Sequence, residues 1–218
     1  IFNISVLLII LANLYLYGNK LIIMDLPEKI YSTPNIINLI KKDNNRFRVL
    51  DIASDYIVYS TKNGLEYVVG IEAGILKDYR DLILLTGKHE GVPFDSFFLF
   101  KNIENENILN LFNTKYIIFD KSLELKNYKL IYKDVYNLFN QNKTVYLYLN
   151  SNPLPRAYIV PNALITKNRN ETFNLIKENK INFKNTVLLE KNSKIDTKNS
   201  SEFKKIDIGF YSPNRIDV

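Results

Sequence analysis

Residues 1–17, IFNISVLLIILANLYLY, open the chain with an apolar run that contains no charged side chain. Only Asn3, Ser5 and Asn13 interrupt it with polar groups. A bilayer core is about 30 Å thick and takes about 20 apolar helical residues to cross, whereas this run spans roughly 25 Å at ~1.5 Å per residue. Because the chain lacks an initiator Met, we expect the missing length upstream, in a helix already under way. The run therefore predicts the last transmembrane helix of a larger protein, with its exit, over residues 1–23.

The residues around this run suit a membrane interface. Tyr15 and Tyr17 stand where interfacial aromatic rings gather, and Lys20 stands where a cation reaches the headgroups. A signal peptide fits less well, because no basic segment precedes the run and no small-residue cleavage site follows it. Asn3 and Asn13 would face neighbouring membrane helices, which indicates a parent protein with several spans. A buried helix of a water-soluble protein is the alternative.

Beyond Gly18 the pattern changes to that of a mixed α+β fold. Thr33 and Pro34 are typical of an N-cap and a first helical residue, and apolar residues at helical spacing follow them. Further patterns predict a mixed α/β extracytoplasmic domain over residues 24–143. Its predicted strands are 47–52 and 116–119, and its predicted helices are 75–85 and a helical face that includes Ile108, Leu111 and Phe112.

The rest of the chain, residues 144–218, is predicted to be a β-rich domain with one short helix. We expect strands at 145–149, 157–160 and 187–189, a helix at 171–178 capped by Asn170, and a mobile polar loop at 191–202. Alternation over 205–210 indicates a strand, a turn follows at 212–214, and a second alternation has barely begun where the sequence stops. An exposed edge of that kind is avoided by natural domains, so we expect a fragment cut at both ends.

Composition excludes several classes of site. The chain has no Cys and a single His, His89, so it forms no disulfide, no Cys-ligated zinc site, no thiol nucleophile and no multi-His metal site. The net charge of +6 comes from lysines scattered among acidic residues, which indicates a solvated surface and not a nucleic-acid interface. The many Asn, Ile, Lys and Tyr residues are typical of a genome-wide base bias.

The motifs that resemble catalytic or ligand-binding patterns are weak. Gly87-Lys88 lacks the first glycine of a phosphate loop, and His89 stands where Ser or Thr would hold magnesium. His89 and Glu90 could form an acid–base pair, but a surface loop is favoured for them. A tight turn accounts for the glycines of residues 70–74, and helix-dipole compensation accounts for the acidic residues of 104–106. The sequence therefore predicts no catalytic, cofactor-binding or metal-ligating residue and no cofactor.

Two segments resemble a known family. Residues 109–118, LNLFNTKYII, and residues 145–160, VYLYLNSNPLPRAYIV, resemble the C-terminal region of the YfhO-like bacterial membrane proteins, polytopic proteins of the GT-C glycosyltransferase type. The sharpest match is the Leu-Pro-Arg-Ala motif of residues 154–157. Weaker matches are Pro34, Arg48 and the Tyr-x-Pro-Asn motif that begins at Tyr211.

The resemblance implies a multi-pass protein of the bacterial cytoplasmic membrane, with the soluble part of this chain on the extracytoplasmic side. Such a parent would take a sugar from a polyprenyl-phosphate donor, with its catalytic carboxylate upstream of this chain. The fragment would then be accessory, helping to position an acceptor polymer, with the bilayer, a polyprenyl-linked sugar and a cell-surface polymer as its partners. Pro155 would fix an extended strand entry, and Arg156 would pair with a nearby carboxylate.

Two other functions stay open at this point. One is a non-enzymatic, membrane-anchored binding or assembly module for cell-surface polymers, which would need only a single anchor helix. The other is a soluble enzyme whose N-terminal run is a core helix. It predicts that the purified chain stays in solution without detergent.

Overall fold

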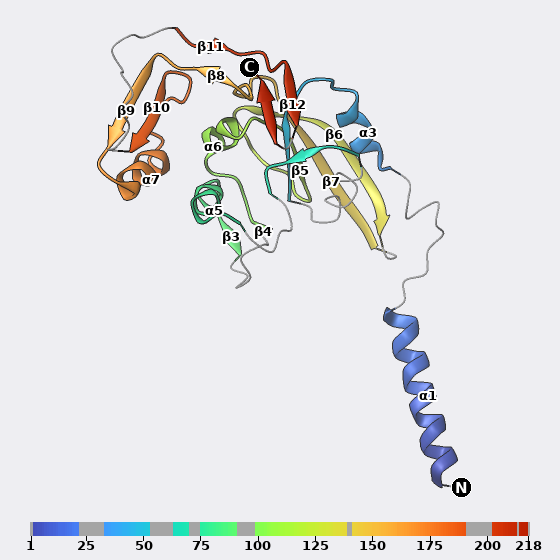
Figure 1. Cartoon of the computed structure of the whole chain (residues 1–218). Coiled ribbons are helices and arrows are strands. Elements are labelled where there is room, and N and C mark those ends of the chain that lie inside the picture. The colour runs from blue at the N-terminus through green and yellow to red at the C-terminus, as the bar shows by residue number, and fades with distance from the viewer. Residues whose placement is uncertain are drawn as a thin grey trace.

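A computed structural model describes residues 2–21, 33–52, 63–69, 75–90, 99–138, 141–190, 202–212 and 214–217. Figure 1 shows a head of mixed helices and strands and, apart from it, one long helix at the N-terminus. The chain is therefore an α+β protein with several sheets, as the sequence predicts.

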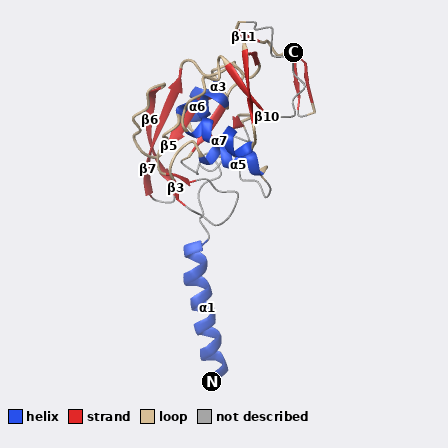
Figure 2. Cartoon of the chain, turned by 90° about the vertical axis from the view of Figure 1, so that its left-hand side faces the viewer, coloured by secondary structure: helices blue, strands red, loops and turns tan. Residues whose placement is uncertain are grey.

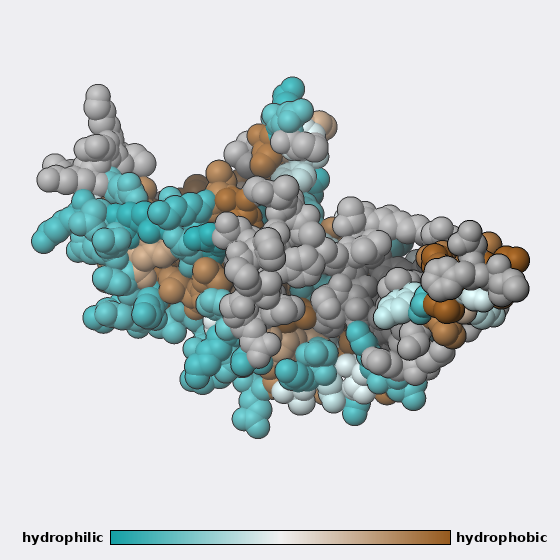
Figure 3. All heavy atoms as spheres, turned by 90° about the horizontal axis from the view of Figure 1, so that it is seen from below, coloured by the Kyte–Doolittle hydropathy of each residue, from teal (hydrophilic) through white to brown (hydrophobic). Residues whose placement is uncertain are grey.

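The N-terminal helix, α1 (Phe2–Leu21), forms where the apolar run predicts a helix. Its large apolar side chains are exposed, from 39% for Val6 to 70% for Tyr15. Both ribbon views place it away from the head (Figures 1 and 2), and its hydrophobic residues lie open to the viewer in the space-filling view (Figure 3). Within the described residues, no helix reaches the combination of length and apolarity that crossing a membrane requires.

A five-stranded mixed sheet organises the head, in the order β2-β1-β5-β7-β6. The first three strands in that order are parallel, and β7 runs antiparallel to both β5 and β6. Because β7 pairs on both sides within this sheet, the sheet continues past the domain boundary expected at residues 143 and 144. The strands are β1 (Arg48–Asp51), β2 (Glu66–Tyr67), β5 (Thr114–Phe119), β6 (Tyr128–Leu138) and β7 (Gln141–Asn150).

Helices cover both faces of this sheet, and the alternation of β5 assigns the faces. Tyr116 and Ile118 pack with the buried isoleucines of α3 (Asn35–Lys41), whereas Ile117 and Phe119 share a second core with residues of α5 (Lys77–Leu84) and α6 (Glu106–Leu111). Strand side chains alternate between faces, so one strand supplies both cores. Each fully buried side chain of this size contributes about 1.5–3 kcal/mol to folding.

The C-terminal part adds short paired strands around one helix, α7 (Arg169–Lys177). The strands β9 and β10 pair in parallel, β8 and β11 pair antiparallel, and β12 and β13 form an antiparallel hairpin. A further antiparallel pair, β3 and β4, lies beside α5 (Figure 1). The strands are β3 (His89–Glu90), β4 (Leu99–Phe100), β8 (Tyr158–Ile159), β9 (Asn162–Thr166), β10 (Thr186–Glu190), β11 (Lys204–Lys205), β12 (Phe210–Ser212) and β13 (Arg215–Asp217).

Most predicted elements are confirmed, but several boundaries and caps are wrong. Pro34, and not Thr33, occupies the N-cap position of helix α3, and this position makes no side-chain capping hydrogen bond. Helix α7 is capped by Asn168 and not Asn170, because the Asn168 side chain accepts a hydrogen bond from the Glu171 N–H at 3.1 Å. The continuous strand predicted at 205–210 is instead two strands, β11 and β12, with non-strand residues between them.

The sequence did not predict the strands β2, β4, β6 and β9. His89 and Glu90 form the short strand β3 where a loop was predicted. The predicted loop at 191–202 lies outside the described residues except for its last residue, and the glycines of residues 70–74 lie outside them entirely.

Candidate functional site: a pocket lined by asparagine

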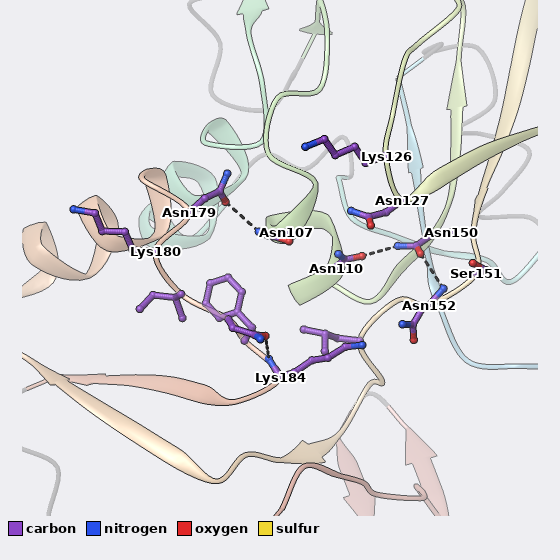
Figure 4. Close-up of a pocket in the computed structure, with 14 residues that line it drawn as sticks. Asn107, Asn110, Lys126, Asn127, Asn150, Ser151, Asn152, Asn179, Lys180 and Lys184 are labelled. Atoms are coloured by element: carbon purple, nitrogen blue, oxygen red, sulfur yellow. Dashed lines mark hydrogen bonds between the residues drawn. The ribbon is translucent and has the colours of Figure 1, made fainter.

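A polar pocket of about 600 Å³ lies where one end of the central sheet meets the segment that follows α7. Figure 4 shows its walls, which come from α6, the turn before β6, the end of β7 and residues 179–184. Asparagine is the commonest lining residue, at Asn107, Asn110, Asn127, Asn150, Asn152, Asn179 and Asn182. The other described lining residues are Lys126, Ser151, Leu154, Lys180, Ile181, Phe183 and Lys184.

One wall is held in place by Glu106, in the first turn of α6. Its two carboxylate oxygens accept hydrogen bonds from the backbone N–H groups of Lys126 and Asn127, each at 2.7 Å. A carboxylate in a first helical turn also interacts favourably with the helix dipole. Because only the backbone is engaged, the side chains of Lys126 and Asn127 are left to line the pocket.

The opposite wall depends on how α7 ends. Asn179 has a φ of 54°, in the left-handed region that Asn tolerates better than most residues. The Asn179 N–H donates to the Ile176 carbonyl and the Lys180 N–H to the Leu175 carbonyl, which together make a Schellman motif. This turn brings the Asn179 side chain back towards α6, where its Oδ1 accepts a hydrogen bond of 3.3 Å from Asn107 Nδ2.

The end of β7 supplies the floor. Asn150 Nδ2 donates to Asn110 Oδ1 at 2.5 Å, and Asn150 Oδ1 accepts from the backbone N–H of Asn152 at 2.9 Å. The buried Asn113, with a φ of 58°, donates through Nδ2 to the carbonyl of Leu154 at 2.7 Å. These bonds tie the turn after β7 to the end of α6, so the polar groups of the pocket are held by the fold.

The pocket carries neutral amides and positive charge. Each Asn amide offers both an acceptor and two donors. Lys180 pairs with Glu178 at 2.6 Å, whereas no carboxylate of the described residues pairs with Lys126 or Lys184. The described lining residues include no carboxylate and no imidazole. Such a surface suits a ligand with many hydroxyl groups and some negative charge.

The weak motif at residues 87–89 lies outside the pocket. A Cβ on Gly87 would lie 2.0 Å from the backbone oxygen of Asn102, so a close chain approach accounts for this glycine. Lys88 pairs with Glu104 at 3.3 Å, and His89 is exposed. None of the three lines the pocket.

The residues that carry the family resemblance do come together. As expected, Arg156 pairs with a carboxylate, since its Nη2 donates to Glu66 Oε2. The same nitrogen donates to the Tyr211 hydroxyl at 2.6 Å, so two of the matched motifs are in contact. Pro155 immediately precedes Arg156, in a segment without regular secondary structure that leads into β8.

The sequence interpretation missed the pocket because it attributed the many asparagines to base bias. Two signals point to specific roles. Asn113 and Asn179 each follow a short helix and precede a change of direction, which is where a left-handed residue is needed. The hydrogen bond between Asn107 and Asn179 joins residues 72 positions apart, so no local pattern in the sequence predicts it.

Among the described residues, no group of three or more His, Asp or Glu side chains is placed to hold a metal ion. In comparisons with known proteins, no family model, no curated protein and no solved structure matches this chain.

Proposed function

We propose that this chain is the membrane-attached, polymer-binding part of a larger bacterial membrane protein. The observation that carries the proposal is the pocket lined by asparagine and lysine, whose chemistry suits an acidic carbohydrate polymer. The exposed apolar helix α1 supports attachment to lipid.

The pocket matches the chemistry of sugar units. A sugar hydroxyl both donates and accepts, and adjacent hydroxyls need partners of both kinds, which amides supply. Phe183 adds an aromatic ring to the lining, against which the apolar face of a sugar can pack. Lys126 and Lys184 provide positive charge for a carboxylate on the same polymer. These groups hold and orient a ligand; at neutral pH neither an amide nor a lysine ammonium accepts a proton from it.

Helix α1 is apolar on every side. Residues 6–11 are six consecutive apolar residues, and at 3.6 residues per turn they surround the helix completely. A helix that is apolar all round belongs in lipid or among other helices, not flat on a membrane surface. The exposed stretch from Ile4 to Tyr17 is about 20 Å long, against about 30 Å for a bilayer core. We therefore place α1 within the bilayer without requiring its described residues to cross it.

The resemblance to the YfhO-like proteins supports a role for this module as an extracytoplasmic accessory domain of a membrane glycosyltransferase, attached to the membrane through α1. In that setting the pocket would hold the acceptor polymer while the parent transfers sugar from a polyprenyl-phosphate donor. The same pocket would serve an anchored assembly module that has no enzymatic partner. Both versions require polymer binding by the head, and that requirement is tested first.

The test is isothermal titration of the full chain with two probes of equal length, a galacturonic acid hexasaccharide and a glucose hexasaccharide. The buffer holds an uncharged polyoxyethylene detergent, which brings neither sugar nor phosphate. We expect the acidic probe to bind and to lose at least tenfold in affinity in Asn150→Ala and in Lys126→Ala. The matched controls are Asn174→Ala and Lys177→Ala, which change exposed residues of α7 outside the pocket. Equal affinity in all five proteins, or no binding of either probe, would contradict the proposal.

A further inference from the structure

Two arginines from distant parts of the chain, Arg46 and Arg156, lie against one tyrosine ring. Arg46 precedes β1, Arg156 follows β7, and Tyr211 belongs to β12. The guanidinium carbons of Arg46 and Arg156 lie 4.7 and 5.6 Å from the centroid of the Tyr211 ring. Arg48, on β1, is the third member. We call Arg46, Arg48 and Arg156 the arginine cluster.

The positive charge of the arginine cluster exceeds the negative charge of the carboxylate that pairs with it. Among the described residues, Glu66 is the carboxylate that pairs with the cluster. Its Oε2 forms an ion pair with Nη2 of Arg156. Among the described residues, the acceptor for the Arg48 guanidinium is the backbone carbonyl of Phe112, at 3.4 Å. Burial and then the nearby charge of Arg156 lower the pKa of the Arg48 guanidinium, while the charge of Glu66 acts in the opposite direction.

One buried donor of the cluster has no acceptor among the described residues. Nη1 of Arg156 is buried and makes no hydrogen bond, while Nη2 of the same group makes two. A buried donor of a charged group loses its hydration without compensation, which native structures avoid. An anionic oxygen at this nitrogen would supply the missing acceptor and the missing charge together.

We propose that the arginine cluster binds a phosphate oxyanion. Within the described part of the chain, three guanidinium charges face one paired carboxylate, and one phosphate group would balance the excess. The planar fork of donors on Arg matches the oxygens of a phosphate and forms two parallel hydrogen bonds with them. Arg46 is exposed while Arg156 is mostly buried, so the site is open to solvent on the Arg46 side. This site is separate from the pocket, which shares none of these residues.

The first experiment measures the melting temperature of the full chain in polyoxyethylene detergent, in sodium phosphate and in sodium chloride of equal ionic strength. Phosphate should raise it in the wild type, in a concentration-dependent manner, because a ligand of the folded state stabilises that state. The effect should weaken at least tenfold in apparent affinity in Arg46→Ala, which removes an exposed side chain.

Arg215→Ala is the matched control, since Arg215 is an exposed arginine of the adjacent hairpin that pairs with Asp217. It should respond to phosphate as the wild type does. The same increase in phosphate and chloride, or an undiminished phosphate response in Arg46→Ala, would overturn the proposal.

The phosphate could belong to a membrane lipid or to a soluble or polymeric ester, and bilayers separate the two sources. In nanodiscs of phosphatidylglycerol, a lipid-occupied site would give no further response to added glycerol phosphate. A site for soluble esters would titrate with glycerol phosphate at the affinity found in detergent. Absence of any phosphate response in both detergent and nanodiscs would refute the site itself.

Discussion

Asn107 and Asn179 share a hydrogen bond of 3.3 Å across the pocket, although 72 positions separate them in the sequence. The bond exists because Asn179 adopts the left-handed conformation that ends α7. Asn179 therefore provides both the left-handed turn and a polar side chain of the pocket. Substitutions at this position can separate these two roles.

Asn179→Gly should leave the stability of the head nearly unchanged and weaken the binding of the galacturonic acid hexasaccharide. Glycine adopts the left-handed region freely but lacks the amide. Asn179→Val should lose the same binding and also about 1–2 kcal/mol of unfolding free energy, because a β-branched residue is strained there. Urea unfolding followed by circular dichroism, with titration calorimetry, distinguishes the two. A Val variant as stable as the Gly variant would show that the turn carries no strain.

Asn113 combines a left-handed backbone with a buried hydrogen bond to the Leu154 carbonyl. Asn113→Gly should cost about 1–2 kcal/mol of unfolding free energy, since it keeps the backbone conformation and leaves a buried carbonyl without its donor. Asn113→Ala should cost about 1 kcal/mol more, because alanine adds left-handed strain. The same urea titration measures both, and equal losses in the two variants would contradict a role for the backbone conformation.

Asp43 should make the head sensitive to acid. Burial opposes ionisation of this carboxyl, but hydrogen bonds from Lys115, Asn45 and Tyr116 outweigh it and lower the pKa to about 2. A lowered pKa gives stabilisation that is present above about pH 4 and is lost as the pH falls through about 2. We expect the wild type to lose up to about 2 kcal/mol in this window. Asp43→Asn should lose less there, while being less stable than the wild type at pH 7; identical pH profiles would argue against this assignment.

Gly87 should tolerate no side chain. A Cβ at this position would lie 2.0 Å from the Asn102 backbone oxygen, so Gly87→Ala forces the two segments apart at a cost of about 1–3 kcal/mol. Gly209→Ala is the control, because its added Cβ would lie 3.9 Å from the nearest atom, at Asp217. Thermal unfolding should separate the two variants clearly. Equal melting temperatures would mean that the close approach at Gly87 relaxes without cost.

The central strands could be predicted because both of their faces are buried. Strands β1, β5 and β7 carry apolar runs, and the two cores take alternate residues from them. Strand β6 was not predicted, because its side chains are not buried on both faces. It lies at the sheet edge, its Leu130 and Val135 are 43% and 58% exposed, and a register shift between Leu130 and Tyr132 breaks its alternation.

The pocket and the arginine cluster could not be predicted in the same way. Arg156 was expected to pair with a carboxylate. Its partner Glu66 lies 90 positions away, so no local sequence pattern identifies it. The choice of Asn168 over Asn170 as the cap of α7 likewise depends on which side chain reaches the Glu171 N–H. Helix and strand patterns follow from local periodicity, whereas these contacts follow from how distant segments pack.

If α1 lies in lipid while the head lies in water, fluorescent labels on the two parts should report different surroundings. The chain has no Cys, so Ile9→Cys and Asn44→Cys each accept a single environment-sensitive fluorophore, one on α1 and one on the head. In reconstituted bilayers we predict that the label at position 9 emits at shorter wavelength and is quenched by brominated acyl chains, while the label at position 44 is quenched by aqueous iodide. If iodide quenches position 9 as strongly as position 44, α1 is not in the membrane, and the account of this chain as a membrane-attached module is wrong.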